Sequence, residues 1–66
     1  MRIILNGSAH ELAGQPCLAD LVRQVSDRGT GIAVAVNSAV VPRSDWPTTA
    51  VHDGDRVDVV TAVQGG

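Results

Sequence analysis

The sequence predicts a two-layer α+β domain in which one main helix packs on one face of a mixed or antiparallel sheet. Three observations lead to this fold class. One segment has helical periodicity, short apolar runs lie on both sides of it, and turn-forming residues separate those runs. The expected order is two strands, the helix and up to three further strands, which gives a sheet of four to five strands.

The first two strands are expected to form a hairpin. Ile3–Leu5 is an apolar run, and a second short run follows Asn6-Gly7. Asn-Gly between two such runs is a strong hairpin signal, because a type I′ turn needs a positive φ at both central residues. We place these strands at residues 1–6 and 8–12.

The helix is expected at residues 17–28. Gly29 suits the position after its last turn, where Arg28 would complement the helix dipole. Cys17 stands at the N-cap, where Ser, Thr or Asp would cap more effectively. The apolar residues share one helical face because they follow the spacing i, i+3, i+4 and i+7: Leu18, Leu21, Val22 and Val25.

The remaining strands are expected at Ile32–Asn37, at Val40-Val41 and at Arg56–Val63. Pro42 ends the middle one. The residues expected to face the helix are Ile32, Val34, Val36, Val57 and Val59.

Two connections lie among these strands. Arg43–Pro47 is expected to be irregular or a short helical turn, with Trp46 at the edge of the core. His52–Asp55 is expected to be a tight turn, because Asp-Gly-Asp is ordinary turn chemistry.

One helix covers only one face of a sheet, so the other face must meet water or a partner. Its expected residues are small and apolar: Ala33, Ala35, Val60 and Ala62. Together they indicate a protein-docking surface. The alternative is that isolated alanines on an exposed sheet need no partner.

Size and composition exclude several functional classes. A chain of 66 residues buries about 60 % of its unfolded surface, too little to enclose a cofactor and a substrate pocket of about 300 Å³. The arginines are scattered, which disfavours nucleic acid. No apolar run reaches the ~20 residues of a membrane span. Cys17 is the single cysteine and no signal peptide is evident, so we expect a cytoplasmic protein.

Other polar residues suggest weaker alternatives. His10 and His52 lack further ligands at metal-binding spacing, so no metal site is expected. Cys17 is a more plausible helix-start residue than a nucleophile. Glu11 and Asp20 would need a cleft to act as an acid/base pair.

The acidic residues Asp53, Asp55 and Asp58 are expected to form a solvated turn and strand face, with a cation or basic partner as the alternative. Asn37 and Arg43 are expected to fix the turn between the third and fourth strands, with a partner contact as the second option.

The chain ends in Gln64, Gly65 and Gly66, directly after the last predicted strand. Two glycines give a thin segment with wide φ/ψ freedom, which can enter a narrow channel. We expect a domain at residues 1–63 and a flexible tail at residues 64–66.

The layout resembles the ubiquitin-like β-grasp fold. Val36-Asn37 leads into Val40–Arg43 with Trp46 after it, Asp53–Asp55 precedes the last strand, and Gly65-Gly66 ends the chain. In order and spacing these features resemble the ThiS family, the sulfur carriers of thiamine thiazole synthesis, over essentially the whole chain. Cys17 departs from the Thr that is more usual at the helix start.

The resemblance implies a carrier that is a co-substrate and not an enzyme. A ThiF-like adenylating enzyme, using ATP and Mg, would activate the carboxylate of Gly66. A sulfur donor system would convert it to a thiocarboxylate, and a ThiG-like thiazole synthase would take the sulfur. Gly65 and Gln64 would thread the partner site. The chain itself would bind no cofactor, because it has no phosphate-binding loop and no lysine.

Two other functions remain open from the sequence. One is a sulfur carrier for molybdopterin or another sulfur-containing metabolite, which would use the same tail chemistry. The other is a ubiquitin-like modifier or a passive interaction module.

Overall fold

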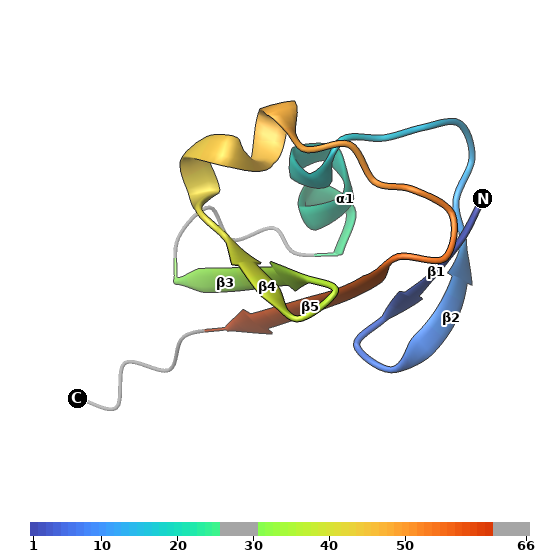
Figure 1. Ribbon diagram of the computed structural model, residues 1–66, viewed down its shortest axis with the longest axis horizontal. Coiled ribbons are helices and arrows are strands. Elements are labelled where there is room, and N and C mark those ends of the chain that lie inside the picture. Colours follow the sequence, from blue (N-terminus) through green and yellow to red (C-terminus); the bar gives the residue numbers. More distant parts are fainter. Residues whose placement is uncertain (26–30, 62–66) are drawn as a thin grey trace.

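The computed structural model of the chain describes residues 1–25 and 31–61, and these form two layers. In Figure 1 the helices α1 and η1 lie together on one side of a sheet. The elements in chain order are β1 (Arg2–Leu5), β2 (Ser8–Glu11), α1 (Leu18–Val25), β3 (Ile32–Val36), β4 (Ala39–Val41), the 3-10 helix η1 (Arg43–Thr48) and β5 (Arg56–Thr61). The predicted α+β class is therefore confirmed.

Among residues 1–25 and 31–61 the sheet has five strands, in the order β2-β1-β5-β3-β4. β5 pairs in parallel with β1, whereas the β1–β2, β3–β4 and β3–β5 pairs are antiparallel. The predicted mixed sheet is thus confirmed, with five strands where four to five were predicted. β5, the last strand of the described residues, occupies the centre of the sheet, so the C-terminal segment follows a strand that has a neighbour on both edges.

Both hairpins close through two-residue turns with positive φ. Asn6 has φ 49° and Gly7 has φ 84°, as the predicted type I′ turn requires. Asn37 has φ 51° and Ser38 has φ 73° between β3 and β4. Because this second turn uses only two residues, β4 begins one residue before the predicted Val40-Val41.

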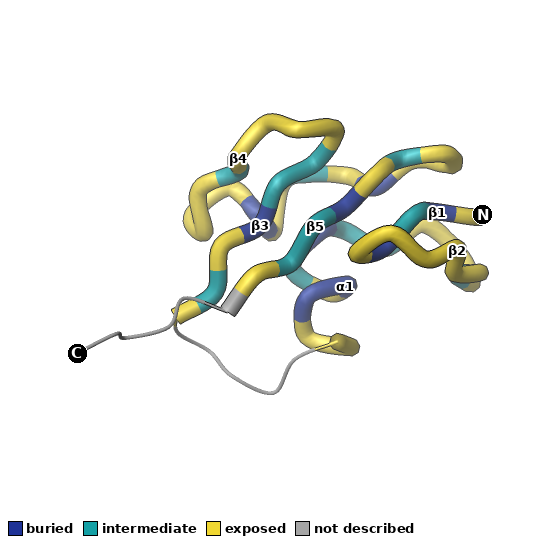
Figure 2. The backbone as a smooth tube through the Cα atoms, turned by 90° about the horizontal axis from the view of Figure 1, so that it is seen from below, coloured by how far each residue is buried: buried dark blue, intermediate teal, exposed yellow. Residues whose placement is uncertain are grey.

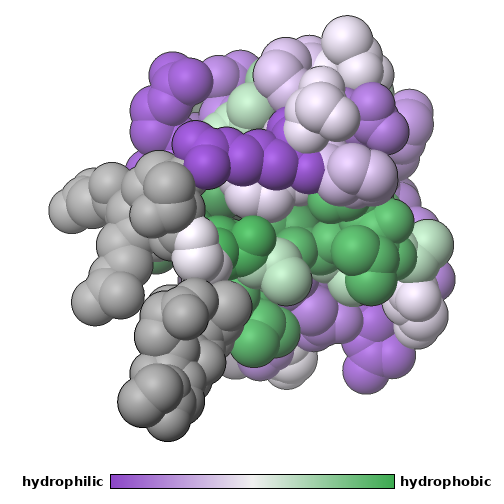
Figure 3. Space-filling model, turned by 90° about the vertical axis from the view of Figure 1, so that its left-hand side faces the viewer, coloured by the Kyte–Doolittle hydropathy of each residue, from purple (hydrophilic) through white to green (hydrophobic). Residues whose placement is uncertain are grey.

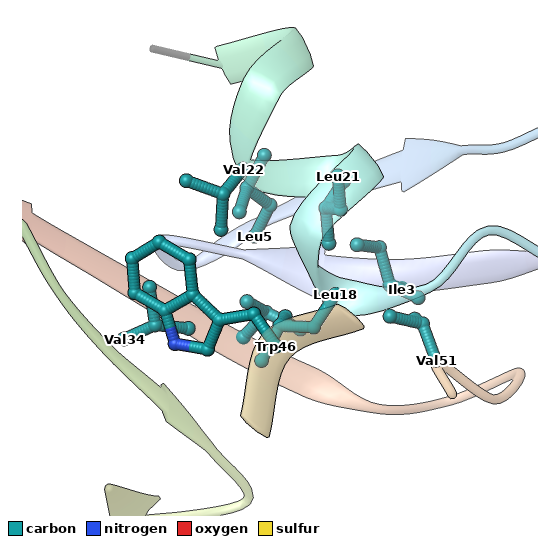
Figure 4. Close-up of a cluster of buried hydrophobic side chains, with 9 residues drawn as sticks. Ile3, Leu5, Leu18, Leu21, Val22, Val34, Trp46 and Val51 are labelled. Atoms are coloured by element: carbon teal, nitrogen blue, oxygen red, sulfur yellow. The ribbon is translucent and has the colours of Figure 1, made fainter. Parts of the chain in front are cut away.

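The core lies between the sheet and the two helices (Figure 4). Trp46 of η1 is buried, as predicted, and its ring lies beside Val34 of β3. The buried hydrophobic side chains of the described residues are Ile3, Leu5, Leu18, Leu21, Val22, Val34, Trp46, Val51 and Val57. Three residues of the predicted apolar helical face, Leu18, Leu21 and Val22, therefore pack on the sheet, whereas the fourth, Val25, is 42 % exposed at the end of α1.

Residues of β3 and β5 alternate between the two faces of the sheet, as in any strand, and Figure 2 marks how far each residue along these strands is buried. Val34 and Val57 are buried, and Ile32, Val36 and Val59 pack partly buried against the core. These are the residues predicted to face the helix, so the predicted inward face of both strands is confirmed.

The start of α1 is held by backbone partners. The N–H of Leu18 donates to the carbonyl oxygen of Thr49 at 2.7 Å, and the N–H of Val51 donates to that of Pro16 at 3.3 Å. The N-cap residue Cys17 forms a β-bridge with Ala50. This backbone anchor compensates for the weak cap, because an otherwise unpaired helix N–H finds a partner.

The predicted helix end, with Arg28 and Gly29, lies outside the described residues. In the part of the chain that the structure describes, no helix is long and apolar enough to cross a membrane.

Candidate functional site

The predicted carrier residues Gln64, Gly65 and Gly66 lie outside the described residues, as does Ala62. The structure describes the strand that leads to them. β5 aligns with β3 from Val57 to Thr61 and with β1 at Arg56 and Val57. The geometry of the site is therefore the geometry of β5, its supports and its exposed face.

Asn37 fixes the start of β5. Its Oδ1 accepts the backbone N–H of Arg56 at 3.0 Å, and its Nδ2 donates to Oδ1 of Asp55 at 3.1 Å. Its backbone N–H also donates to the carbonyl oxygen of Arg56 at 2.7 Å. The predicted structural role of Asn37 is confirmed and extends from its own turn to the central strand. The same role predicted for Arg43 is wrong, since Arg43 opens η1 beyond β4.

Asn6 supports β5 from the opposite edge. Its backbone N–H donates to the carbonyl oxygen of Val57 at 2.9 Å. Its side-chain Oδ1 accepts the backbone N–H of Val59 at 2.8 Å. Both contacts join residues about fifty positions apart in the chain, so the sequence offers no local signal for them.

The acidic turn before β5 is an internal anchor. Oδ1 of Asp53 accepts the backbone N–H of Arg2 at 2.7 Å. Oδ2 of Asp55 accepts the N–H of His52 at 2.8 Å, while the N–H of Asp55 donates to the carbonyl oxygen of His52 at 3.0 Å. Both carboxylates accept backbone N–H groups, one from β1 and one from within the turn. The geometry therefore supports a structural turn at Asp53 and Asp55 over a site for a cation or a basic partner.

The sheet face opposite α1 carries exposed apolar side chains from β3, β4 and β5, with the half-buried Asp58 beside them, opposite Ala35. Val60 of β5 is 59 % exposed and lies opposite Ala33 of β3, which is also exposed. Val40 of β4 is 75 % exposed and lies opposite Ala35, which is half-buried. We call Ala33, Ala35, Val40 and Val60 the outer sheet patch.

Of the predicted docking residues, Ala33 and Val60 are exposed as expected, and Ala35 is less accessible than expected. Val40 was missed by sequence reasoning, although its place next to Val41, which packs against the core, would have indicated it, because successive side chains of a strand point to opposite faces. Figure 3 shows hydrophobic side chains gathered in a band across the end of the molecule where β3 begins and β5 ends.

The weaker candidates have separate partners. Glu11 is paired with Arg2, with 2.9 Å between Oε1 and Nε. Asp20 lies near Arg23, with 3.9 Å between Oδ1 and Nη1, and accepts from Sγ of Cys17 at 3.3 Å. The structure therefore does not join Glu11 and Asp20 as an acid/base pair. Among residues 1–25 and 31–61, no group of three or more His, Cys, Asp or Glu side chains could hold a metal ion.

The part of the chain that the structure describes has a five-stranded mixed sheet, one main helix on one face and β5 at the centre, which defines a β-grasp domain. The ThiS family model matches residues 3–66. The chain belongs to the ThiS family.

Individual relatives agree with this assignment. The chain is 33 % identical to the sulfur carrier protein ThiS of Escherichia coli K12 over 66 residues, which is all of both chains. It is also 27 % identical over 66 residues to a thiazole synthase of Paramagnetospirillum magneticum, where the match spans 20 % of that enzyme.

Two solved structures of a thiamine biosynthesis protein from Geobacter metallireducens have the same fold. The crystal structure, of ThiS, matches with a TM-score of 0.87 at 25 % identity and covers all of both chains. The solution structure matches with a TM-score of 0.82 at 25 % identity and covers all of this chain and 88 % of the other. The predicted family is thus confirmed, and the chain is a sulfur carrier protein of thiamine biosynthesis and not an enzyme.

Proposed function

We propose that the α-carboxylate of Gly66 carries the sulfur. The observation that supports this most directly is the full-length match to a sulfur carrier, which runs through the last residue of both chains. The position of β5 at the sheet centre adds a physical reason. A reactive group on a short glycine arm needs a rigid base, since an unsupported base would add to the entropy that is lost on binding.

The chemistry requires a partner that adenylates the carrier. A carboxylate lacks an adequate leaving group, so it first attacks the α-phosphorus of ATP and displaces pyrophosphate. A sulfur nucleophile then attacks the acyl-adenylate and AMP departs, which leaves a thiocarboxylate on Gly66. Mg²⁺ and phosphate-binding donors stabilise the charge in such steps. The chain has no lysine and no glycine-rich phosphate loop, so a ThiF-like enzyme would supply these parts.

The proposed acceptor of the sulfur is a ThiG-like thiazole synthase. The similarity of this whole chain to one fifth of a thiazole synthase supports that pairing. Gln64 and Gly65 would enter the partner's channel, since residues without large branched side chains keep the arm thin. The cytoplasm, where ATP is plentiful, is the proposed place of action.

The outer sheet patch is the proposed docking surface for these partners. Val40 and Val60 present apolar area that no described residue covers, and Ala33 beside them lets a partner approach the sheet closely. Ala62 would extend the same face toward the tail. Apolar contacts of this kind would compensate for the entropy lost when the arm is ordered, about 1–2 kcal/mol per residue.

The test is reconstitution with a ThiF-like enzyme, Mg-ATP and a sulfur donor, followed by the intact mass of the chain. We expect the mass change of one oxygen-to-sulfur exchange, and none after deletion of Gly66. A chain extended by one residue beyond Gly66 is the matched control, because it keeps both glycines but moves the carboxylate. Equal sulfur incorporation into the extended chain or the deletion variant would refute the proposal.

A further inference from the structure

We propose that Asn6 is a positioning residue for the carrier arm, an inference that rests on the proposed role of Gly66. Its side chain accepts a hydrogen bond from the backbone N–H of Val59. Among the described residues, this is the hydrogen bond nearest the arm between the β1 side of the sheet and β5. Asn6 would thereby set where the arm leaves the domain and the direction in which it leaves.

The contact replaces a rung of the parallel ladder. Leu5 is opposite Val57, and the N–H of Asn6 donates to the carbonyl oxygen of Val57. Continued pairing would bring the next backbone carbonyl of β1 to the N–H of Val59. The chain instead reverses at Asn6-Gly7, and Oδ1 of Asn6 accepts that hydrogen at 2.8 Å.

β3 cannot take over this contact. Successive N–H groups of a strand point to opposite edges. Since the N–H of Val59 points toward Asn6, it points away from β3, on which Val59 is opposite Val34. Without the Asn6 side chain, the N–H of Val59 would have no acceptor on the β1 edge among the described residues, because the pairing of β1 with β5 ends at Leu5 and Val57.

Asparagine meets two requirements at this position. It tolerates the φ of 49° at the first residue of the turn, and it supplies the acceptor for Val59. Glycine meets the first requirement only. Aspartate meets both, because Asp-Gly also forms type I′ turns and a carboxylate oxygen accepts hydrogen bonds.

The consequence for the arm follows from support on one edge only. Without the Asn6 contact, β5 beyond Val57 is held, among the described strands, by β3 alone, so the direction in which the arm leaves is less well defined and the effective concentration of its carboxylate in a partner site falls. The outer sheet patch on β3 and β4 keeps its place. The loss therefore falls on the rate at saturating carrier and not on the carrier concentration that half-saturates the enzyme.

Asn37 supplies a matched control. It is also the first residue of a two-residue turn, with φ 51°, and its Oδ1 also accepts a β5 backbone N–H, that of Arg56, at 3.0 Å. This contact lies at the start of β5, away from the arm. Asn6→Gly and Asn37→Gly thus each remove a side-chain acceptor for a β5 backbone N–H, and both keep a residue that accepts positive φ. Asn37→Gly also removes the bond from Nδ2 to Asp55, so it perturbs the domain at least as much, at a position farther from the arm.

The experiment measures kcat and KM for thiocarboxylate formation by a ThiF-like enzyme, with hydrogen exchange of the Val59 amide as a second readout. For Asn6→Gly we expect kcat to fall about three- to tenfold, the range that one net hydrogen bond represents, with KM unchanged and protection of Val59 lost. Asn37→Gly keeps kcat, and Asn6→Asp restores both the rate and the protection. Measurements are made well below each unfolding midpoint, so that global destabilisation does not enter.

Three results would overturn the inference. One is a kcat for Asn6→Gly equal to that of the unaltered chain. Another is an equal loss in Asn37→Gly, which would show a general effect of strand stability. If the unaltered chain itself gains no sulfur, the proposed function fails and this inference fails with it, whereas the first two results leave the proposed function standing.

Discussion

Trp46 donates its indole N–H to the carbonyl oxygen of Val41, 2.9 Å away, and so ties η1 to the end of β4. The ring itself is buried in the core. One side chain therefore joins the short 3-10 helix to an edge strand and fills the space beside β3. This contact explains how a chain with a single aromatic residue closes one end of its core.

We expect Trp46→Phe to lower the free energy of unfolding by about 1–2 kcal/mol, because the carbonyl of Val41 loses its donor while most of the apolar burial remains. Trp46→Ala should cost about 3–5 kcal/mol, because it also opens a cavity. Urea unfolding followed by circular dichroism measures both, since the variants have no tryptophan fluorescence. Equal costs for the two variants would show that the hydrogen bond contributes nothing.

Asp55→Ala is expected to destabilise the domain by about 1–3 kcal/mol, because the Nδ2 of Asn37 and the N–H of His52 both lose their acceptor. Asp58→Ala is the comparison, since Asp58 lies in β5, three residues after Asp55, and faces the outer side of the sheet. Its loss should change the free energy of unfolding by no more than about 0.5 kcal/mol. Thermal melts of the two variants compare these losses of stability. A smaller cost at Asp55 than at Asp58 would contradict the anchor role of the turn.

Val60→Glu is expected to lower kcat/KM for thiocarboxylate formation by about tenfold or more, because a partner would have to desolvate the new charge. The fold should persist, since the Val60 side chain is 59 % exposed. Val25→Glu introduces the same charge on α1, which covers the other face of the sheet, where Val25 is 42 % exposed. If Val25→Glu impairs the reaction as much as Val60→Glu, the outer sheet patch is not the docking surface.

Gly65→Val is expected to leave the melting curve unchanged, because Gly65 follows the last described strand. Adenylation should be blocked, since a β-branched side chain widens the arm and restricts its φ/ψ range. Gly65→Ala should retain part of the activity. Release of pyrophosphate from ATP measures this step, and normal release with Gly65→Val would show that the arm does not enter a narrow channel.

Local sequence patterns were sufficient for much of the fold. Asn6-Gly7 indicated its turn because both residues tolerate positive φ, and the alternation in Ile32–Val36 indicated which face packs on the helix. The turn at Asn37-Ser38 was harder to place, because serine is an unusual residue at φ 73°.

Contacts between distant segments were beyond the reach of local patterns. The parallel pairing of β1 with β5 joins the two ends of the chain, and no periodicity encodes which strands become neighbours. The same limit applies to Asn6, whose turn was predicted while its bond to Val59 was not. The chemistry assigned to Gly66 came from the family resemblance, since a terminal Gly-Gly alone does not define a reaction.

The central claim is that this chain delivers sulfur from Gly66 to the thiazole of thiamine. The most direct measurement is a single-turnover reaction of a ThiG-like thiazole synthase with the purified chain carrying isotope-labelled sulfur. We expect the label to appear in the thiazole product while the chain returns to its original carboxylate mass. An unlabelled product, or a chain that keeps its labelled sulfur while product forms, would contradict the account.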